Sequence, residues 1–381
     1  MGSKQFDRRS FLKDTAKAAT GMTLMTTFPK NLPFSQVEVK PKINFSVINM
    51  NHAHIYGMVD AVTRGGGQLV SFYAKEPELI DAFAKKYPYA KLAKDKREIL
   101  EDTSIQLVLS SGIPVERAPL GIEVMQHGKD YLSDKPGAIS LKQLKEIRAV
   151  QKETQRIYSI MYSERHENQA TVKAGSLIKD GAIGKVIQTI GLGPHRMNVK
   201  SRPYWFFDKK YFGGIITDIG SHQMDQFLYF TGSTKAEIVA SQVGNLNNLS
   251  YPEFEDFGDA MIKGDQGTGY VRVDWFTPDG LNTWGDGRLT ILGTDGYIEL
   301  RKYVDIAGQK GGNHLYLVNQ KETRYIDCNK EPLPFGELFV NDIINRTETA
   351  MTQQHCFLAT ELALLAQKKA KRVNSSNVLS R

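Results

Sequence analysis

Two polar clusters in this sequence contain the side chains that proton-transfer chemistry needs. The first is Asp134-Lys135-Pro136, which closes the stretch KDYLSDKP directly after an apolar run. A lysine at the carboxyl end of a strand, held by the proline that follows it, points over the sheet toward a bound ligand. Its ammonium group is then a donor to a substrate hydroxyl. The alternative is an ordinary surface lysine in a turn.

The second cluster lies in the stretch GGIITDIGSHQMD at residues 213–225. On one helix, Asp218 and His222 are four residues apart and Asp225 lies three beyond His222, so all three would share a face. A carboxylate and an imidazole presented together suit proton transfer at neutral pH. The alternative is a capped helix with a solvated polar face.

A third cluster, 49–54 (NMNHAH), stands where a dinucleotide-binding fold carries G-x-G-x-x-G. Asparagine tolerates left-handed backbone, so Asn49 and Asn51 can replace the first two glycines. His52 and His54 alone do not predict a metal site. Zinc needs three or four ligands, and neither a cysteine nor a carboxylate joins the two histidines in this stretch.

The elements that must position these side chains alternate between strands and helices over residues 40–165. Short apolar runs predict the strands, and stretches with helical spacing lie between them. The predicted strands are 43–49, 68–73, 105–110, 130–132 and 157–162, and the predicted helices are 54–64, 77–86, one ending at 124, and 141–151. This alternation predicts a Rossmann-like α/β domain with a parallel sheet and sites at the strand carboxyl ends.

The remaining chain, 166–381, has a different pattern. Strand-length runs are separated by Gly, Asp and Asn turns, and most have no helix between them. The runs are 186–191, 236–243, 259–263, 269–275, 288–292 and 297–300, preceded by a helix over 169–180 and followed by one over 350–371. We expect an α+β domain with an open, largely antiparallel sheet, and a cleft between the two domains.

The composition is that of a globular protein, with 381 residues, 41% of them hydrophobic. The formal net charge is +7, and residues 1–35 contribute +4 of it. The rest of the basic residues are scattered without a stripe, so no nucleic-acid partner is predicted. Cys328 and Cys356 are the only cysteines, and two such distant cysteines are expected to be unpaired.

Residues 1–35 read as an export leader. The stretch DRRSFLK at 7–13 closely resembles the twin-arginine motif, and the mildly apolar stretch 15–28 that follows is too short to span a bilayer. A basic, disordered arm is the alternative. We expect a periplasmic protein whose mature form has no integral membrane segment.

Together these motifs resemble the glucose–fructose oxidoreductase, inositol dehydrogenase and MocA (Gfo/Idh/MocA) family over essentially the whole mature chain. DKPGA is similar to the family's E-K-P signature with Asp for Glu, and GGIITDIGSHQMD to its Asp-x-x-x-His helix signature. ILGTDGYIEL resembles its Gly-Thr-x-Gly hairpin, and DGAIGKVI its joint between helix and sheet. The resemblance implies an NAD- or NADP-dependent oxidoreductase that moves a hydride to or from a hydroxyl carbon of a sugar, glycoside or polyol.

By the family pattern, Lys135 touches the reacting hydroxyl and the nicotinamide ribose, His222 is the acid/base, and Asp218 orients and charges that pair. The residues expected on the cofactor side are Asn49, Asn51, His52, His54, Lys75, Ser111, Asp134 and Lys135. Those expected on the substrate side are Tyr162, Glu164, Arg165, His195, Arg196 and Arg202. Salt bridges or packing are the alternative roles of this second group.

Cofactor selectivity and reaction type stay open at this point. Where an acid would grip the ribose 2′-hydroxyl, the sequence reads Tyr73-Ala74-Lys75-Glu76, and Lys75 is able to neutralise a 2′-phosphate. An exported enzyme would need a tightly bound cofactor, regenerated in place by a second substrate. The alternatives are an NAD-dependent redox glycosidase and a non-catalytic sugar-binding protein on the same fold. A homo-oligomer built on the open sheet is compatible with the family pattern.

Overall fold

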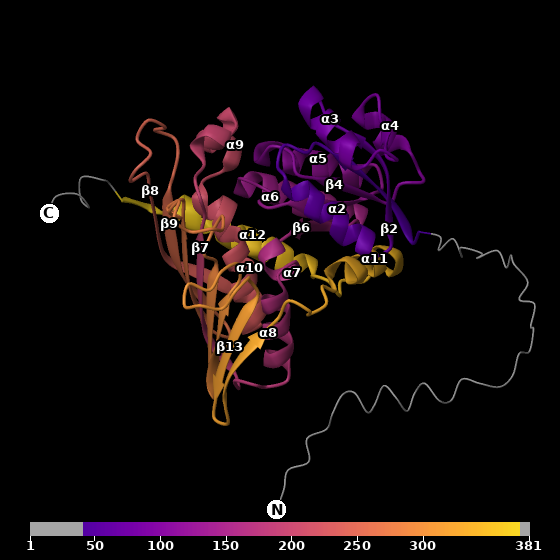
Figure 1. The fold of residues 1–381 in the computed structure, drawn as a ribbon. Coiled ribbons are helices and arrows are strands. Elements are labelled where there is room, and N and C mark those ends of the chain that lie inside the picture. The colour runs from indigo at the N-terminus through magenta and orange to yellow at the C-terminus, as the bar shows by residue number, and fades with distance from the viewer. Residues whose placement is uncertain (1–40, 374–381) are drawn as a thin grey trace, which may run out of the picture. The chain divides into compact units, whose positions relative to one another are not determined.

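The computed structural model describes residues 41–373, so the predicted export leader lies outside the described residues. The N-terminal part contains a six-stranded, fully parallel sheet in the order β3-β2-β1-β4-β5-β6. Figure 1 shows this part in indigo and purple, with β2, β4 and β6 labelled. The strands are β1 (Ile43–Ile48), β2 (Gly67–Tyr73), β3 (Lys91–Leu92), β4 (Leu107–Ser110), β5 (Asp130–Asp134) and β6 (Tyr158–Met161). The predicted Rossmann-like architecture is confirmed.

Burial explains why these short runs become strands. Every residue of β4 and β5 is buried, as expected for central strands of a parallel sheet covered on both faces. The strand order reverses between β1 and β4, and ligands of such sheets bind outside the carboxyl ends at this switch point. The loops that follow β1 and β4 therefore lie at the expected binding crevice.

Five helices cover this sheet. They are α2 (His54–Arg64), α3 (Pro77–Lys86), α4 (Lys96–Glu101), α5 (Pro114–Gln126) and α6 (Leu141–Thr154). Capping residues and a proline fix where several of these helices begin. Asp95 caps α4 by accepting hydrogen bonds from the backbone N–H groups of Arg97 and Glu98, and Ser140 caps α6 in the same way. Pro114 opens α5, where its missing N–H costs nothing.

The C-terminal sheet has nine strands in the order β14-β13-β12-β11-β7-β10-β9-β8-β15. They are β7 (Val186–Pro194), β8 (Ala236–Gly244), β9 (Phe257–Gly264), β10 (Thr268–Asp274), β11 (Arg288–Gly293), β12 (Gly296–Arg301), β13 (His314–Asn319), β14 (Thr323–Asp327) and β15 (Lys371–Val373). The pairs β7–β10 and β8–β15 are parallel and the others are antiparallel. The prediction of a largely antiparallel sheet is confirmed, although the sequence pattern did not reveal β13, β14 or β15.

Six further helices are described in this part of the chain. They are α7 (Ser163–His166), α8 (Gln169–Lys179), α9 (Lys209–Phe212), α10 (Ser221–Thr231), α11 (Phe335–Asn345) and α12 (Gln353–Lys369). Helix α12 joins the two sheets, because it contacts α10 and β8 of the C-terminal part and α6 and β6 of the N-terminal part. Helix α11 packs against α2, where a Cβ on Gly65 would lie 2.1 Å from the Gly336 carbonyl oxygen. Only glycine permits that approach.

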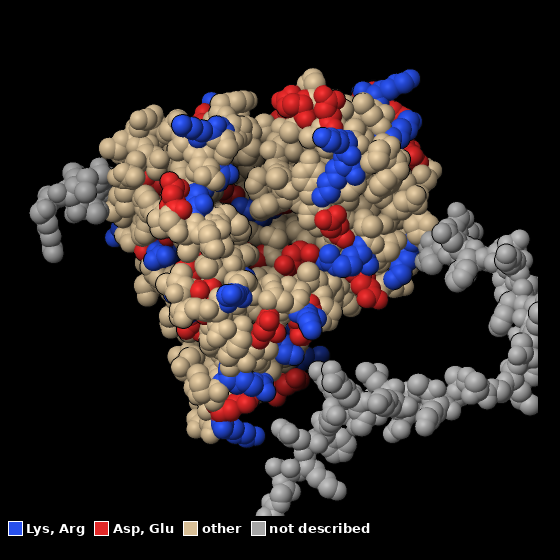
Figure 2. Space-filling view, viewed as in Figure 1, with Lys and Arg blue, Asp and Glu red and all other residues tan. Residues whose placement is uncertain are grey.

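Three shorter segments complete the described chain: 3₁₀ turns at Val199–Ser201 and Tyr204–Phe207, and a π-helical turn at Ile216–Gly220 directly before α10. Cys328 and Cys356 are buried and unpaired, as predicted. Within residues 41–373, no helix is long and apolar enough to cross a membrane. Figure 2 shows basic and acidic side chains interspersed over the visible face.

Candidate active site and cofactor cleft

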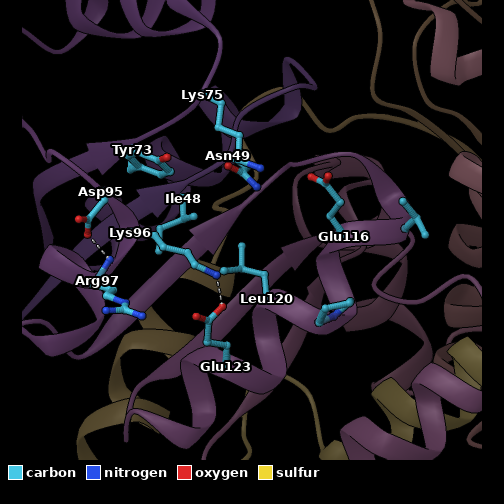
Figure 3. Close-up of a pocket in the computed structure, with 12 residues that line it drawn as sticks. Ile48, Asn49, Tyr73, Lys75, Asp95, Lys96, Arg97, Glu116, Leu120 and Glu123 are labelled. Carbon is cyan, nitrogen blue, oxygen red and sulfur yellow. Dashed lines mark hydrogen bonds and ion pairs between the residues drawn. The ribbon is translucent and has the colours of Figure 1, made fainter.

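Two cavities lie along the carboxyl edge of the parallel sheet. The larger, of about 570 Å³, is lined from β1, β2, α4, α5 and the segments beside them (Figure 3). The smaller, of about 250 Å³, is lined by the loop after β1, by Lys135, and by residues of the C-terminal part, among them His195, Arg202, Trp205, Asp218 and Trp275. Asn49 borders the larger cavity, and Asn51, His52 and His54 border the smaller. One loop therefore borders both cavities.

The backbone of this loop is held by neighbouring strands. Asn49 has a left-handed φ of 61°, its N–H donates to the Tyr73 carbonyl, and its own carbonyl accepts from the Ser111 N–H at 3.1 Å. The Ser111 hydroxyl donates to the His52 carbonyl at 2.7 Å. Asn49 thus replaces a glycine as expected, whereas Asn51 does not adopt left-handed backbone. Ser111 is buried and positions the loop without lining either cavity.

Asp134, the last residue of β5, contacts three polar side chains. Its carboxylate oxygens lie 2.8 Å from His52 Nδ1, 2.9 Å from His54 Nδ1 and 3.1 Å from Arg117 Nη2. Burial alone would raise the pKa of Asp134, but His54 and Arg117 hold it well below its usual value. Burial, together with His54, lowers the pKa of His52 to about 4, so His52 is neutral at pH 7.

This cluster corrects the argument that no carboxylate joins the two histidines. The fold brings β5 beside the loop after β1, and ligand atoms of His52, His54 and Asp134 lie within 4.8 Å of one another. Such a group is able to hold a metal ion. The Arg117 guanidinium, however, already supplies a positive charge to the same carboxylate.

Arg117 is a site residue that the sequence analysis missed. It is 2% exposed on α5, and its guanidinium donates to the carbonyls of Gly112, Lys135 and Pro136 as well as to Asp134. The one available signal was a single basic residue among the apolar residues of α5. Arg117 ties the loop after β4 to the turn that carries Lys135.

Lys135 and Asp218 meet at the smaller cavity. Lys135 Nζ lies 2.9 Å from Asp218 Oδ1, and both side chains are largely buried. Burial alone would raise the pKa of Asp218, but Lys135 lowers it below the usual value. The structure thus brings the first two predicted clusters together, with a cation and an anion beside the same space.

His222 lies deeper. It is 3% exposed, is not among the residues that line the smaller cavity, and its Nδ1 has no hydrogen-bond partner among the described residues. Burial lowers the pKa of His222 to about 3, although Glu164 acts in the opposite direction. The imidazole is therefore neutral at pH 7.

Asp225 departs from the predicted arrangement of the second cluster. Its carboxylate pairs with Arg165 at 2.7 Å and with His355 at 2.8 Å, whereas Asp218 faces Lys135. The π-helical turn that contains Asp218 interrupts the α-helical spacing on which a shared face depends. The three side chains consequently serve different partners.

The expected substrate-side residues fall into two groups. His195 and Arg202 line the smaller cavity, where His195 packs beside Trp275 and Arg202 lies over the Phe206 ring. Burial and Lys135 lower the pKa of His195 to about 4. The others do not line this cavity: the Tyr162 hydroxyl bonds Thr360, Arg165 pairs with Asp225 beside a separate cavity of about 140 Å³, and Arg196 donates to the carbonyls of Pro278 and Leu281.

Glu164 forms a buried ion pair that sequence reasoning did not find. Its Oε2 accepts from Lys302 Nζ at 2.6 Å and from the amides of Gln223 and Gln226. Burial alone would raise the pKa of Glu164, but Lys302 and His222 lower it far below the usual value. Lys302 follows β12 in the C-terminal sheet, so the pair links the two parts of the chain.

Comparison with known proteins agrees with this geometry. Residues 48–162 match the model of the oxidoreductase family with an NAD-binding Rossmann fold, and residues 171–299 match the GFO/IDH/MocA C-terminal domain. A crystal structure described as that of an oxidoreductase from Erwinia carotovora atroseptica SCRI1043 is 43% identical. It superposes with a TM-score of 0.84 over 87% of this chain and 99% of that one. The chain belongs to the Gfo/Idh/MocA family.

Two further relatives have named activities. The scyllo-inositol 2-dehydrogenase (NAD(+)) of Bacillus subtilis strain 168 is 26% identical over 274 residues, covering 69% of this chain and 75% of that protein. A levoglucosan dehydrogenase, solved in complex with NADH and levoglucosan, is 17% identical with a TM-score of 0.69. It covers 86% of this chain and 96% of the other, and it supports the fold alone.

The residues present fit the nicotinamide dinucleotide of this oxidoreductase family. A dinucleotide needs an elongated cleft at the switch point, and here one loop borders two cavities. The backbone is crowded where the loops meet, because a Cβ on Gly112 would lie 3.0 Å from the Asn49 Cβ. Asn49 and Lys75 would face the adenosine half in the larger cavity, and His52, His54 and Lys135 the nicotinamide half.

Proposed function

We propose that this protein is a nicotinamide-dependent dehydrogenase that acts on a hydroxyl carbon of a sugar, glycoside or polyol. The observation that carries the proposal is the Lys135–Asp218 pair, buried beside the smaller cavity that shares the loop after β1 with the larger one. The Bacillus subtilis relative, named for an inositol, supports a polyhydroxylated substrate.

The oxidation of a hydroxyl carbon removes a proton and a hydride, and residues of this chain are placed to accept the proton. Lys135 donates a hydrogen bond to the reacting hydroxyl oxygen, and Asp218 holds the ammonium in place. His222 lies behind the lining of the smaller cavity and is neutral at pH 7, so we assign it the hydroxyl proton that is released as the C–O bond becomes a carbonyl, with the substrate hydroxyl entering the space beside Lys135. The bound nicotinamide supplies the acceptor for the hydride that leaves the same carbon.

The lining of the smaller cavity suits a carbohydrate ring. Trp205, Phe206 and Trp275 contribute aromatic side chains to the lining, with the Arg202 guanidinium over the rings of Phe206 and Trp275, and His195 adds a polar group. Aromatic faces pack against the C–H face of a ring, and the polar groups bind its hydroxyls.

Two measurements test this function. Mass spectrometry of nucleotide that co-purifies with the protein identifies the cofactor, and a panel of sugars and polyols is then followed at the absorbance of the reduced nicotinamide. We expect at least one polyhydroxylated compound to reduce the bound nucleotide. A protein that binds sugar without any redox change would instead be a binding protein on this fold.

We also propose that the chain is exported by the twin-arginine route. The support is the stretch DRRSFLK at residues 7–13, in which Arg8-Arg9 precedes Ser-Phe-Leu-Lys. Replacing Arg8 and Arg9 by lysine should retain the protein in the cytoplasm, as measured by cell fractionation. Unchanged fractionation would rule out this route.

Export has a consequence for the cofactor. A compartment without a renewable nicotinamide pool favours a nucleotide carried out bound and regenerated in place by a second substrate. We therefore expect extensive dialysis to leave nucleotide at a sizeable fraction of sites. Complete loss on dialysis, with activity that then needs stoichiometric added cofactor, would contradict the closed cycle.

A further inference from the structure

We propose that the larger cavity selects NADP+ over NAD+, with Lys75 and then Arg97 as the cations that face the adenosine 2′-phosphate. The inference rests on the proposed function, because it concerns the cofactor of the same cleft. It starts from the end of β2, where Rossmann domains distinguish a ribose 2′-hydroxyl from a 2′-phosphate.

The acid that would bind a 2′-hydroxyl is missing from its usual place. Tyr73 ends β2 and lines the cavity, and the next residue, Ala74, is 3% exposed and has no polar side-chain atom. Lys75 follows, and its exposed side chain lines the same cavity. An alanine thus stands where an NAD-selective domain has a carboxylate, and a cation follows it directly.

The nearest acid in the sequence, Glu76, is committed elsewhere. Its Oε1 accepts a hydrogen bond from Asn51 Nδ2 at 2.9 Å, and its Oε2 accepts one from the Lys75 backbone N–H at 3.2 Å. Glu76 is not among the residues that line the larger cavity. Its carboxylate therefore positions the loop after β1 and leaves the charge of Lys75 facing the cavity.

Three basic residues line the cavity, and they differ in pairing. Lys96 Nζ lies 2.5 Å from Glu123, which neutralises it. Within residues 41–373, the side chains of Lys75 and Arg97 form no ion pair. Two cations therefore keep their charge available to a ligand.

The cavity also contains two other acids, and neither stands at the end of β2. Asp95 is used as the cap of α4. Glu116 lies in the first turn of α5, which Figure 3 shows across the cavity from Tyr73, with Lys75 projecting near Asn49. The lining as a whole has three basic and three acidic residues, but Lys75 is the charged lining residue that follows the end of β2, and a cation there favours a phosphate over a hydroxyl.

Calorimetric titration of the purified full chain, freed of nucleotide, with NADP+ and NAD+ tests the inference through binding alone. We expect NADP+ to bind at least about tenfold more tightly, and its affinity to fall more steeply with salt, because Lys75 and Arg97 are exposed. Lys75→Ala should weaken NADP+ binding about ten- to hundredfold and NAD+ binding less than about threefold. Arg97→Ala should have a smaller effect in the same direction.

Lys96→Ala is the matched control, because it removes one positive charge from the same cavity but from a residue already paired with Glu123. It should leave the preference between the two nucleotides unchanged. Equal affinities in the wild type, or equal losses for both nucleotides in Lys75→Ala, would overturn the inference. So would a selective loss of NAD+ binding in Glu76→Gln, which would make Glu76 the ribose ligand. If neither nucleotide binds, the proposed function itself fails.

Discussion

The two cavities at the carboxyl edge of the parallel sheet differ in the exposure and pairing of their charged side chains. In the larger cavity, Lys75 and Arg97 are exposed, and the one ion pair, Lys96–Glu123, is partly solvated. Around the smaller cavity, Lys135 and Arg117 are buried and each is paired with a carboxylate. Solvated charges attract a ligand at little cost to the fold, whereas buried charges interact strongly and perturb one another's pKa.

This difference in exposure matches two different tasks, nucleotide binding in the larger cavity and proton transfer in the smaller one. The larger cavity is equipped to bind a charged nucleotide end, and its side chains can change with limited effect on stability. The smaller cavity holds an ammonium and a carboxylate in contact with each other, with His195 in its lining and His222 behind it, and both imidazoles are neutral at pH 7.

The largest effect is expected on turnover, from Lys135→Met. This change removes the donor to the reacting hydroxyl and leaves Asp218 without its partner. We expect kcat to fall by about 10²–10⁴-fold, the usual worth of proton-transfer groups. Steady-state kinetics measure it, with the exposed Lys145→Met as the control. Turnover near that of the wild type would remove Lys135 from the mechanism.

Asp134→Asn should have the largest effect on stability. Arg117 would lose its carboxylate while it stays buried, and breaking a buried ion pair costs about 3–5 kcal/mol. Denaturant unfolding measures the loss, and the exposed Asp81→Asn should change it by less than about 0.5 kcal/mol. Equal stability of the two variants would mean that the Asp134 cluster does not support the fold.

A pH dependence follows from three histidines in or beside the smaller cavity whose pKa values are lowered. The folded pKa values of His52, His195 and His222 are about 4, 4 and 3, below the ordinary value of 6.5. As pH falls below about 6.5, the unfolded chain therefore binds protons first, and stability decreases by about 1.4 kcal/mol per pH unit for each histidine. The lowered pKa values of Asp134 and Asp218 act only at still lower pH, below about 4.

Denaturant unfolding at pH 7.5 and at pH 5.5 checks this dependence. We expect lower stability at pH 5.5, and a smaller difference between the two pH values in His195→Asn. The exposed His127→Gln should leave the difference unchanged. A wild-type stability that is flat across this range would show that these histidines are not held neutral.

The smallest effect is expected in the larger cavity. Lys96→Ala removes an ion pair whose side chains are 44% and 31% exposed, and such pairs contribute less than about 1 kcal/mol. Thermal or denaturant unfolding measures it. A loss above about 2 kcal/mol would show that the charges of the two cavities are not as different as their exposure indicates.

Periodicity was enough to predict the parallel sheet and most of its helices, because β1, β4 and α3 are local patterns of burial. Motif resemblance placed Lys135 and Asp218 at one site, and the structure brings them within hydrogen-bond distance. Strand β14 escaped prediction because its residues are mostly exposed and charged or polar, so it lacks an alternating apolar face.

The rest depends on contacts that sequence spacing does not contain. Asp134 meets His52 across 82 residues and His54 across 80, and Lys302 meets Glu164 across 138. Each pair forms only when separate strands end at the same edge or when the two sheets pack together. The π-helical turn at Ile216–Gly220 is a further example, because uniform α-helical spacing predicted a shared face for Asp218 and Asp225.

The most direct test of the central claim, a hydride-linked reaction at the smaller cavity, is the sugar and polyol panel run on the wild type and His222→Asn together. We predict that a polyhydroxylated compound reduces the bound nucleotide in the wild type. The variant should retain nucleotide but react about 10²–10⁴-fold more slowly. Equal rates in the two proteins, or binding of a sugar with no change in the nicotinamide absorbance of nucleotide-loaded protein, would contradict the account.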